Sequence, residues 1–139
     1  MDVLHKNAKI ELLKRSPLFE GCSKRELQKI ASITDELQLP KGTALITEGE
    51  RGREFFALVQ GAVEVRRKGR KVAALGDGDF FGEIALVADT PRSATVTAVS
   101  PVSVLVIVDR DFRMLMRESP SIQGKVLTAL AQRLAPETL

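Results

Sequence analysis

Short apolar runs separated by single glycines occupy the middle of this chain, from Leu37 to Val108. Runs of this length that are rich in β-branched and aromatic residues predict strands, and glycines suit the turns that join them. The sequence therefore predicts an antiparallel sandwich or roll. We expect strands at about residues 55–58, 62–66, 94–99 and 102–108, with glycines between strands at positions 42, 49, 52, 61, 69, 76 and 78.

Helical patterns precede the β-rich region. Leu4, Ala8 and Leu12 have the spacing of residues that share one helix face, which is expected to pack on the β-roll or, alternatively, to form an interface with a partner. Pro17 interrupts this pattern, and residues 23–26 have the form of a capping box that opens a second helix to about residue 33. Residues 1–34 are therefore predicted to be helical.

Helical patterns also follow the β-rich region. Asp109 is expected to cap a helix that reaches about residue 117. Ser119 and Pro120 form a favourable start for a last helix, which is expected to end near residue 135, before Pro136. The chain is thus predicted to be one α+β, mainly β domain, with a β-roll at residues 35–108 and C-terminal helices at residues 109–139.

The most informative motif joins residues 80–86 (FFGEIAL) to residues 91–96 (PRSATV). Gly82 permits close approach of a ligand to the backbone, since it has no Cβ atom. Arg92 offers a planar, charged fork to a phosphate, and Glu83 can accept a hydrogen bond from a hydroxyl group. The motif therefore predicts a site for a small anion that also carries a hydroxyl.

This motif resembles the phosphate-binding cassette of the cyclic nucleotide-binding domain family, which includes catabolite activators, regulatory subunits of protein kinase A and cyclic nucleotide-gated channels. The resemblance extends from about residue 13 to about residue 134. It includes residues 17–19, 48–50, 55–61 and 76–82. It implies an eight-stranded jelly-roll-like β-barrel, with a cassette at residues 80–96 that contains a short helix.

The resemblance also assigns roles within the cassette. It implies that Glu83 accepts the ribose 2′-hydroxyl, and that Arg92 anchors the ring phosphate together with the backbone N–H groups of Ala85 and Ser93. The alternatives are that Glu83 is an ordinary exposed helix residue, and that Arg92 pairs at the surface with an aspartate such as Asp79 or Asp89. The predicted ligand-binding residues are Gly82, Glu83, Ile84, Ala85, Arg92, Ser93 and Ala94.

The sequence also suggests residues that contact the base and cover it. Ser93 favours cAMP, because relatives that prefer cGMP often carry threonine after the cassette arginine. Arg133 on the last helix either stacks on the base, as in some related channels, or is a solvated helix residue. The predicted apolar wall for the base consists of Val63, Val72, Ala73 and Leu75, each of which is alternatively part of the barrel core.

Composition excludes several other functions. With 44% hydrophobic and 28% charged residues the chain has the balance of a globular protein, and no apolar run is long enough to span a membrane. The single cysteine, Cys22, is typical of a cytoplasmic protein. With His5 as the only histidine, no metal site, cofactor or enzymatic activity is expected.

The predicted function is that of a cytoplasmic cyclic nucleotide sensor whose last helix moves when the ligand binds. The alternatives are an interaction scaffold without a ligand, and the sensory fragment of a cAMP-responsive transcription factor or channel. A protein effector and a homodimer formed by the terminal helices are possible partners. Autonomous DNA binding is not expected, because no helix-turn-helix follows the last helix, and the basic residues 66–71 are read as a solvated hairpin tip.

Overall fold

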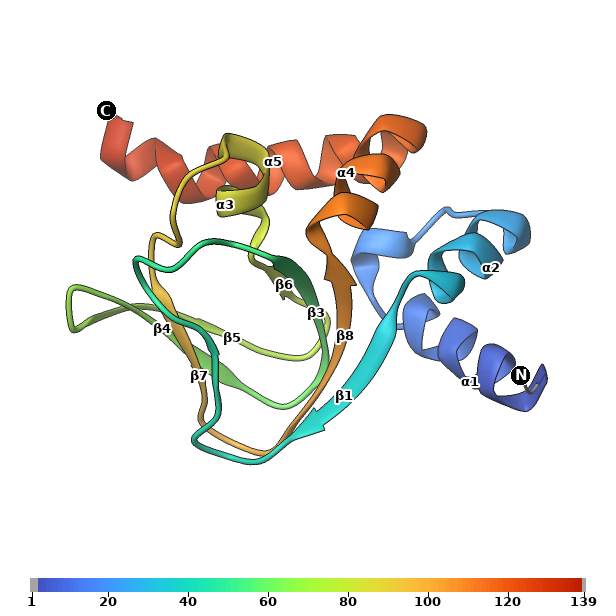
Figure 1. Ribbon diagram of the computed structural model, residues 1–139, viewed down its shortest axis with the longest axis horizontal. Helices are drawn as coiled ribbons and strands as arrows, with labels where there is room; N and C mark the ends of the chain where they lie inside the picture. Colours follow the sequence, from blue (N-terminus) through green and yellow to red (C-terminus); the bar gives the residue numbers. More distant parts are fainter. Residues whose placement is uncertain (1–2, 139) are drawn as a thin grey trace.

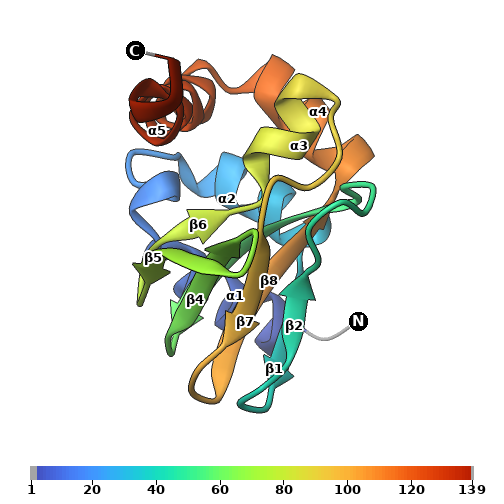
Figure 2. The same cartoon turned by 90° about the vertical axis from the view of Figure 1, so that its left-hand side faces the viewer.

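The computed structural model describes the backbone of residues 3–138 and the side chains of residues 8–134. Within this part, the strands form two antiparallel sheets of four strands each (Figures 1 and 2). The first sheet has the order β1 (Asp35–Leu39), β8 (Val102–Val108), β3 (Glu54–Gln60) and β6 (Phe80–Phe81). The second has the order β2 (Ala44–Ile46), β7 (Thr95–Ala98), β4 (Val63–Arg67) and β5 (Arg70–Leu75). This arrangement confirms the predicted mainly β, jelly-roll-like fold.

The space between the two sheets is filled by aliphatic and aromatic side chains. Successive residues of a strand point to opposite faces, so alternate positions contribute to this interior. Leu58, Val63 and Val104 have no exposed surface, and the rings of Phe56 and Phe81 stack with centroids 5.1 Å apart. The shared interior fixes the register of the strands, because a shift by one residue would turn these side chains outward.

The N-terminal helices cover the outer face of the first sheet (Figure 1). They are α1 (Val3–Lys14), the single 3₁₀ turn η1 (Pro17–Phe19) and α2 (Lys24–Ser32). The predicted capping box is present: the Glu26 N–H donates to Ser23 Oγ at 3.1 Å, and the Ser23 N–H donates to Glu26 Oε1 at 2.9 Å. The boundaries of α2 therefore follow from local sequence chemistry.

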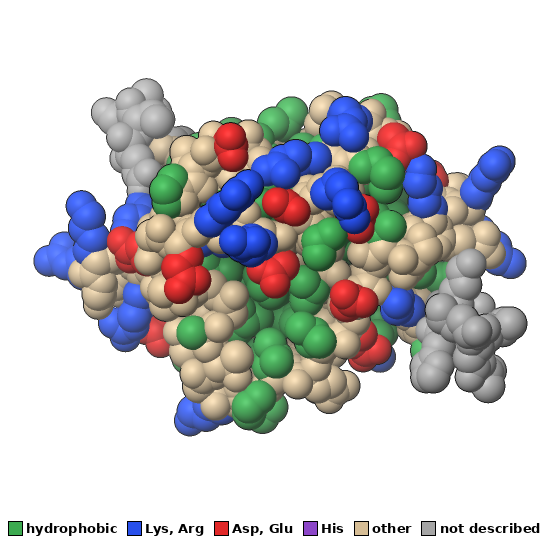
Figure 3. Space-filling model, in the orientation of Figure 1, with side chains coloured by type: hydrophobic (Ala, Val, Ile, Leu, Met, Phe, Trp, Pro, Cys, Tyr) green, Lys and Arg blue, Asp and Glu red, His purple; other side chains and the backbone are tan. Residues whose placement is uncertain are grey.

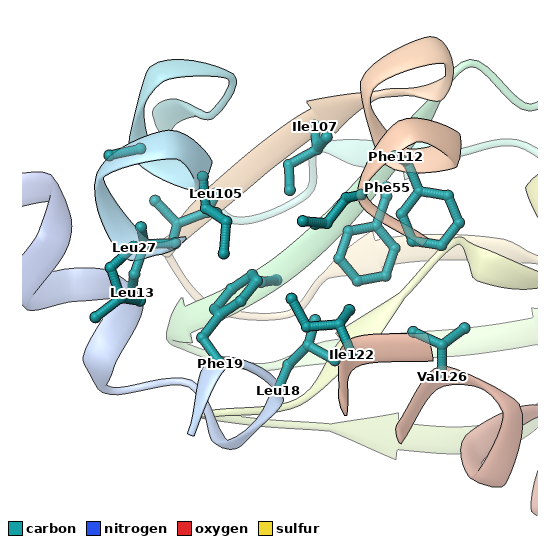
Figure 4. Close-up of a cluster of buried hydrophobic side chains, with 14 of the residues drawn as sticks. Leu13, Leu18, Phe19, Leu27, Phe55, Leu105, Ile107, Phe112, Ile122 and Val126 are labelled. Atoms are coloured by element: carbon teal, nitrogen blue, oxygen red, sulfur yellow. The ribbon is translucent and has the colours of Figure 1, made fainter. Parts of the chain in front are cut away.

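The face of α1 that packs on the core differs from the prediction. Ala8 is exposed and Leu12 is half-buried, whereas Ile10 and Leu13 are buried. The side chain of Leu4 lies outside the described residues. The prediction was wrong because α1 packs against α2 and the first sheet through the face that carries Ile10 and Leu13. These two residues belong to a second hydrophobic cluster, on the outer face of the first sheet, and Figure 4 shows Leu13 within it.

That second cluster connects both ends of the chain to the first sheet. Figure 4 shows Phe19 and Leu18 of the N-terminal turn facing Phe55 of β3, with Phe112 and Ile122 from the C-terminal helices beside them. Phe55 and Phe112 stack with their centroids 4.7 Å apart. The helices at both termini therefore share one core with the sheet.

The C-terminal helices are α4 (Asp109–Glu118) and α5 (Pro120–Thr138). The N-cap of α4 is Val108 rather than the predicted Asp109, which instead lies in the first turn and pairs with Arg113. The predicted start of α5 is confirmed, since the Ile122 N–H donates to Ser119 Oγ at 3.4 Å. The predicted end of α5 near residue 135 was wrong, because the helix continues past Pro136 to Thr138. The lost hydrogen bond of the proline nitrogen and the contact of its ring with the carbonyl four residues earlier both affect only the last turns of the helix.

Helix α5 lies beside the cassette helix α3 (Glu83–Ala88), and its first turns contact the N-terminal turn (Figures 1 and 2). The Lys125 ammonium group donates to three backbone carbonyls of that turn, those of Pro17 at 2.9 Å, Leu18 at 3.3 Å and Glu20 at 2.6 Å. These contacts hold the early part of α5 against η1. In the described residues, no helix has both the length and the apolar character to cross a bilayer.

Candidate ligand-binding site

A cavity of about 440 Å³ lies between the cassette, the second sheet and α5. Its volume is within the range of sites that enclose small organic ligands, roughly 300–1,000 Å³. Apolar side chains and backbone form most of the lining, with Glu83, Arg92, Arg67 and Arg133 as its charged groups. The full lining consists of Ile46, Val65, Arg67, Val72, Ala73, Phe81, Gly82, Glu83, Ile84, Ala85, Arg92, Ser93, Ala94, Val96, Gln132 and Arg133.

The cassette helix begins at Gly82, which adopts a left-handed backbone conformation with φ of +95°. A Cβ atom at this position would lie 3.0 Å from the Glu54 carbonyl oxygen and 3.2 Å from Arg92 Nη1. Both the backbone angle and the lack of space therefore require glycine. This conformation turns the chain from β6 into α3, and so brings Glu83 to the cavity.

The Arg92 side chain is fixed by the backbone. Its guanidinium group donates to the Gly82 carbonyl at 2.9 Å and to the Glu54 carbonyl at 2.6 Å, rather than to a surface aspartate. The residue is 7% exposed, and this burial lowers the pKa of the guanidinium group, with Glu54 acting in the opposite direction. The cavity therefore contains a rigid cation that has lost much of its hydration and that an anion would stabilise.

Gly52 makes room for this arginine. A Cβ atom on Gly52 would lie 2.8 Å from the Ala85 Cβ and 3.3 Å from Arg92 Cζ. The sequence identified Gly52 only as a turn residue between strands. Its closeness to Ala85 and Arg92, which are distant in sequence, becomes visible only in the folded chain.

The Glu83 side chain is fully buried, although it is a carboxylate. Its Oε1 atom forms an ion pair with Arg133 of α5. Its Oε2 atom is buried and has no hydrogen-bond partner among the described residues. Native structures rarely leave such an oxygen without a donor, since this costs about 1–3 kcal/mol. The cavity therefore contains an acceptor that a ligand hydroxyl can satisfy.

Arg133 connects α5 to the cassette. Besides its pairing with Glu83, it donates to the Phe80 carbonyl at 2.6 Å, and its guanidinium carbon lies 5.3 Å from the centroid of the Phe80 ring. Burial lowers the pKa of this arginine, with the charge of Asp79 acting in the opposite direction. The side chain of Arg133 is only 30% exposed and packs on the cassette, so the alternative prediction that Arg133 is a solvated helix residue is wrong.

A family model described as "Cyclic nucleotide-binding domain" matches residues 36–119, which include the cassette and both sheets. The chain belongs to the cyclic nucleotide-binding domain family. Within the described side chains, no cluster of three or more histidine, cysteine, aspartate or glutamate residues is suited to a metal ion.

Characterised members of this family resemble the chain over most of its length. A cAMP-dependent protein kinase regulatory subunit of Yarrowia lipolytica is 40% identical over 106 residues, which cover 75% of this chain and 28% of that protein. A cGMP-dependent protein kinase of Eimeria tenella is 33% identical over 133 residues, which cover 96% of this chain and 13% of that protein. The chain thus spans less than a third of the length of either relative.

A solved structure described as "Sp-2Cl-cAMPS bound to PKAR CBD2" has the same fold, with a TM-score of 0.82 and 24% identity. The match covers 98% of this chain and 93% of that one. This likeness supports the arrangement of sheets and helices over almost the whole cyclic nucleotide-binding domain.

Most predicted site residues lie together in this domain. The cassette residues Gly82, Glu83, Ile84, Ala85, Arg92, Ser93 and Ala94 all line the cavity, as do Val72, Ala73 and Arg133. Val63 and Leu75 do not line it, and their placement in the base wall was wrong. They lie opposite each other in the β4–β5 pairing, where Val63 is fully buried between the sheets and Leu75 packs against the same cluster.

Sequence reasoning missed several lining residues. Val65 follows Val63 by two positions and therefore lies on the same strand face, but nearer to the cavity. Arg67 was grouped with the solvated hairpin tip, yet it lines the cavity, and its Nε–H donates to the Ser93 carbonyl at 3.2 Å. The strand alternation from Val63 through Val65 to Arg67 was the signal that could have identified both residues.

Proposed function

We propose that this domain binds a 3′,5′-cyclic mononucleotide, preferentially cAMP, and that binding controls the position of α5. One observation carries the proposal: the buried Oε2 of Glu83, which has no partner among the described residues, and the desolvated guanidinium group of Arg92 line the same cavity. A cyclic nucleotide supplies the complementary chemistry, a hydroxyl donor and a single negative charge on one rigid frame.

The phosphate is expected to bind beside Arg92. Two backbone carbonyls already fix the orientation of this guanidinium group, so little side-chain entropy is lost on binding. The backbone N–H groups of Ala85 and Ser93 are the further donors that we assign to the phosphate. One guanidinium group with backbone donors matches the single charge of a cyclic phosphodiester.

The ribose is expected to donate its 2′-hydroxyl to Glu83. Because Oε1 is engaged by Arg133, the hydrogen bond is assigned to Oε2. A 2′-deoxyribose lacks this donor and leaves the buried oxygen unsatisfied, so the site selects ribose over deoxyribose.

The base is expected to lie against the wall formed by Val65, Val72 and Ala73. The cAMP preference rests on Ser93, which stands where cGMP-selective relatives often have threonine. Both kinds of nucleotide occur in the names of the related kinases, so a titration with cAMP and with cGMP decides between them.

The response to ligand is expected to pass through α3. Leu86 of this helix shares the core cluster with Phe112 of α4 and with Ile122 and Val126 of α5. An inward shift of the cassette therefore repacks the C-terminal helices, while Arg133 couples α5 directly to Glu83. The ligand favours the closed position only by the amount that it binds this position more tightly.

Calorimetric titration with cAMP, cGMP and 2′-deoxy-cAMP tests the proposal. Arg92→Ala is expected to weaken cAMP binding by about thirtyfold to a thousandfold, since charge-assisted hydrogen bonds contribute about 1.5–3 kcal/mol each. Arg110→Ala removes an exposed arginine from α4 and is the matched control, with unchanged affinity expected. The absence of cAMP and cGMP binding, in a wild-type chain that melts cooperatively, would refute the proposal and favour the scaffold alternative.

Glu83→Gln provides an independent test of the sugar contact. The wild type is expected to prefer cAMP over 2′-deoxy-cAMP by at least about tenfold, because the deoxy ligand leaves a buried acceptor unpaired. This preference should shrink in Glu83→Gln. An equal preference in both proteins would exclude the 2′-hydroxyl contact.

We also propose that the domain acts by binding and not by catalysis, as the cytoplasmic sensory part of a larger signalling assembly. The share of the kinase relatives that it spans, between 13% and 28%, supports a regulatory role within a longer protein or complex. The effector is expected to contact the C-terminal helices, because the ligand changes their packing.

A further inference from the structure

The positive charge of this chain is concentrated in one hairpin. Strands β4 and β5 and their turn contain five cations and one carboxylate, Glu64. The hairpin thus has a net charge of +4, whereas the whole chain carries +3, so the other residues together carry −1. The five cations are Arg66, Arg67, Lys68, Arg70 and Lys71.

At the tip of the hairpin, Lys68 has a left-handed backbone conformation that lysine rarely adopts. Lys68 and Gly69 both have positive φ angles, +52° and +77°, as in a type I′ turn. Asparagine, aspartate or glycine suits the first of these positions better than lysine does. Figure 3 shows basic side chains on the lobe at the left-hand edge of the molecule, where Figure 1 shows the hairpin projecting.

The same hairpin also provides an open sheet edge. Among the described residues, β5 pairs with β4 alone, and it forms the outer edge of its sheet (Figure 2). Residues 70–74 are exposed and Leu75 is half-buried. The β4–β5 pairing is irregular near Val65 and Arg66, which leaves residues 73–75 as a regular edge next to the cationic tip. The outward N–H and C=O groups of such an edge can pair with another strand.

We propose that this edge and its cationic tip bind an acidic, extended segment of a partner protein by strand addition. The backbone of the partner would pair with residues 73–75, and its carboxylates would contact Lys68, Arg70 and Lys71. A second copy of this chain is disfavoured at this edge, because each copy carries a net charge of +4 on this hairpin and the two hairpins would repel each other. A phosphate surface satisfies the cations but provides no N–H donors for the strand carbonyls, so the combined features favour a peptide.

Fluorescence anisotropy with a labelled octapeptide of alternating glutamate and valine tests the proposal. It is carried out on the full chain, without cyclic nucleotide, so that its outcome is independent of the function proposed above. We expect saturable binding at low ionic strength, which weakens as salt is added. The triple variant Lys68→Asn, Arg70→Gln, Lys71→Gln should bind about tenfold to a hundredfold more weakly, and asparagine suits the φ angle at position 68.

Two controls separate strand addition from simple charge attraction. The variant Lys24→Gln, Arg110→Gln, Arg117→Gln removes three exposed cations outside the hairpin and should retain at least about half of the affinity. The same octapeptide, N-methylated at every residue, keeps its carboxylates but cannot donate backbone hydrogen bonds, and should bind at least about tenfold more weakly.

Several results would overturn the proposal. These are no binding of the octapeptide at low salt, equal binding of its methylated form, or equal losses in the two triple variants. Tighter binding of a short DNA duplex or of phosphatidylserine vesicles than of the peptide, abolished by the hairpin variant, would instead assign this surface to phosphate groups.

Discussion

The ion pair between Arg133 and Glu83 gives the most direct test of how α5 is attached to the cassette. Replacing Arg133 with glutamine leaves the Glu83 carboxylate fully buried and removes its ion pair with α5, while its second oxygen still has no partner in the described part of the chain. It also removes the hydrogen bond to the Phe80 carbonyl and the contact with the Phe80 ring. The unliganded protein should therefore lose stability.

The size of this loss follows from the burial of the two partners. Removing one partner of a fully buried pair costs about 3–5 kcal/mol. Glu83 is fully buried, but the side chain of Arg133 is 30% exposed, so water partly screens the pair. We therefore expect Arg133→Gln to lower the free energy of unfolding by about 2–3 kcal/mol, which corresponds to a decrease in Tm of about 6–10 °C.

Urea denaturation of the wild type and four variants measures this effect. Lys29→Gln is the matched control, because Lys29 pairs with Glu118 at 2.7 Å on the surface, with both side chains about half exposed, and should lose less than about 1 kcal/mol. The double variant Glu83→Gln, Arg133→Gln should lose about 1–2 kcal/mol less than the sum of its single variants. The reasoning is refuted if Arg133→Gln costs no more than Lys29→Gln, or if the two site substitutions are additive.

Three further substitutions test other parts of the structure. Gly52→Ala should weaken cAMP binding by at least about tenfold in calorimetry, because the new Cβ displaces Ala85 and Arg92, whereas Gly124→Ala has free space around it and should leave binding unchanged. Lys68→Asn alone should raise the free energy of unfolding by a few tenths to about 1 kcal/mol, and a loss of stability would contradict the left-handed turn. Ser23→Ala should cost about 1 kcal/mol in urea denaturation by removing the cap of α2, and no change would show that this cap is not needed.

The features that the sequence predicted well are those set by local chemistry. The capping box at Ser23 and the start of α5 at Ser119 depend on residues within one helical turn of each other. The cassette from Gly82 to Arg92 is also compact in sequence, so its residue types and spacing were sufficient to place it in one cavity.

The features that the sequence did not predict depend on which face of an element meets a distant partner. Ile10, rather than Ala8, is buried in α1 because α2 and the first sheet select that face. Val63 and Val65 have the same orientation on β4, but only Val65 lies far enough along the strand to line the cavity, and the position of the cavity along the strand is set by the folded chain. The pairing of Arg133 with Glu83 joins residues fifty positions apart, so no local pattern could reveal it.

The three carbonyl contacts of Lys125 determine where the last helix can pivot. They fix α5 to η1 near its beginning, and Arg133 lies eight residues further along the helix, about 12 Å away at 1.5 Å per residue. A bend of about 10° at this pivot would displace Arg133 by about 2 Å, enough to break its hydrogen bonds to the cassette. A small angular change near the anchor thus becomes a complete loss of contact at the binding cavity.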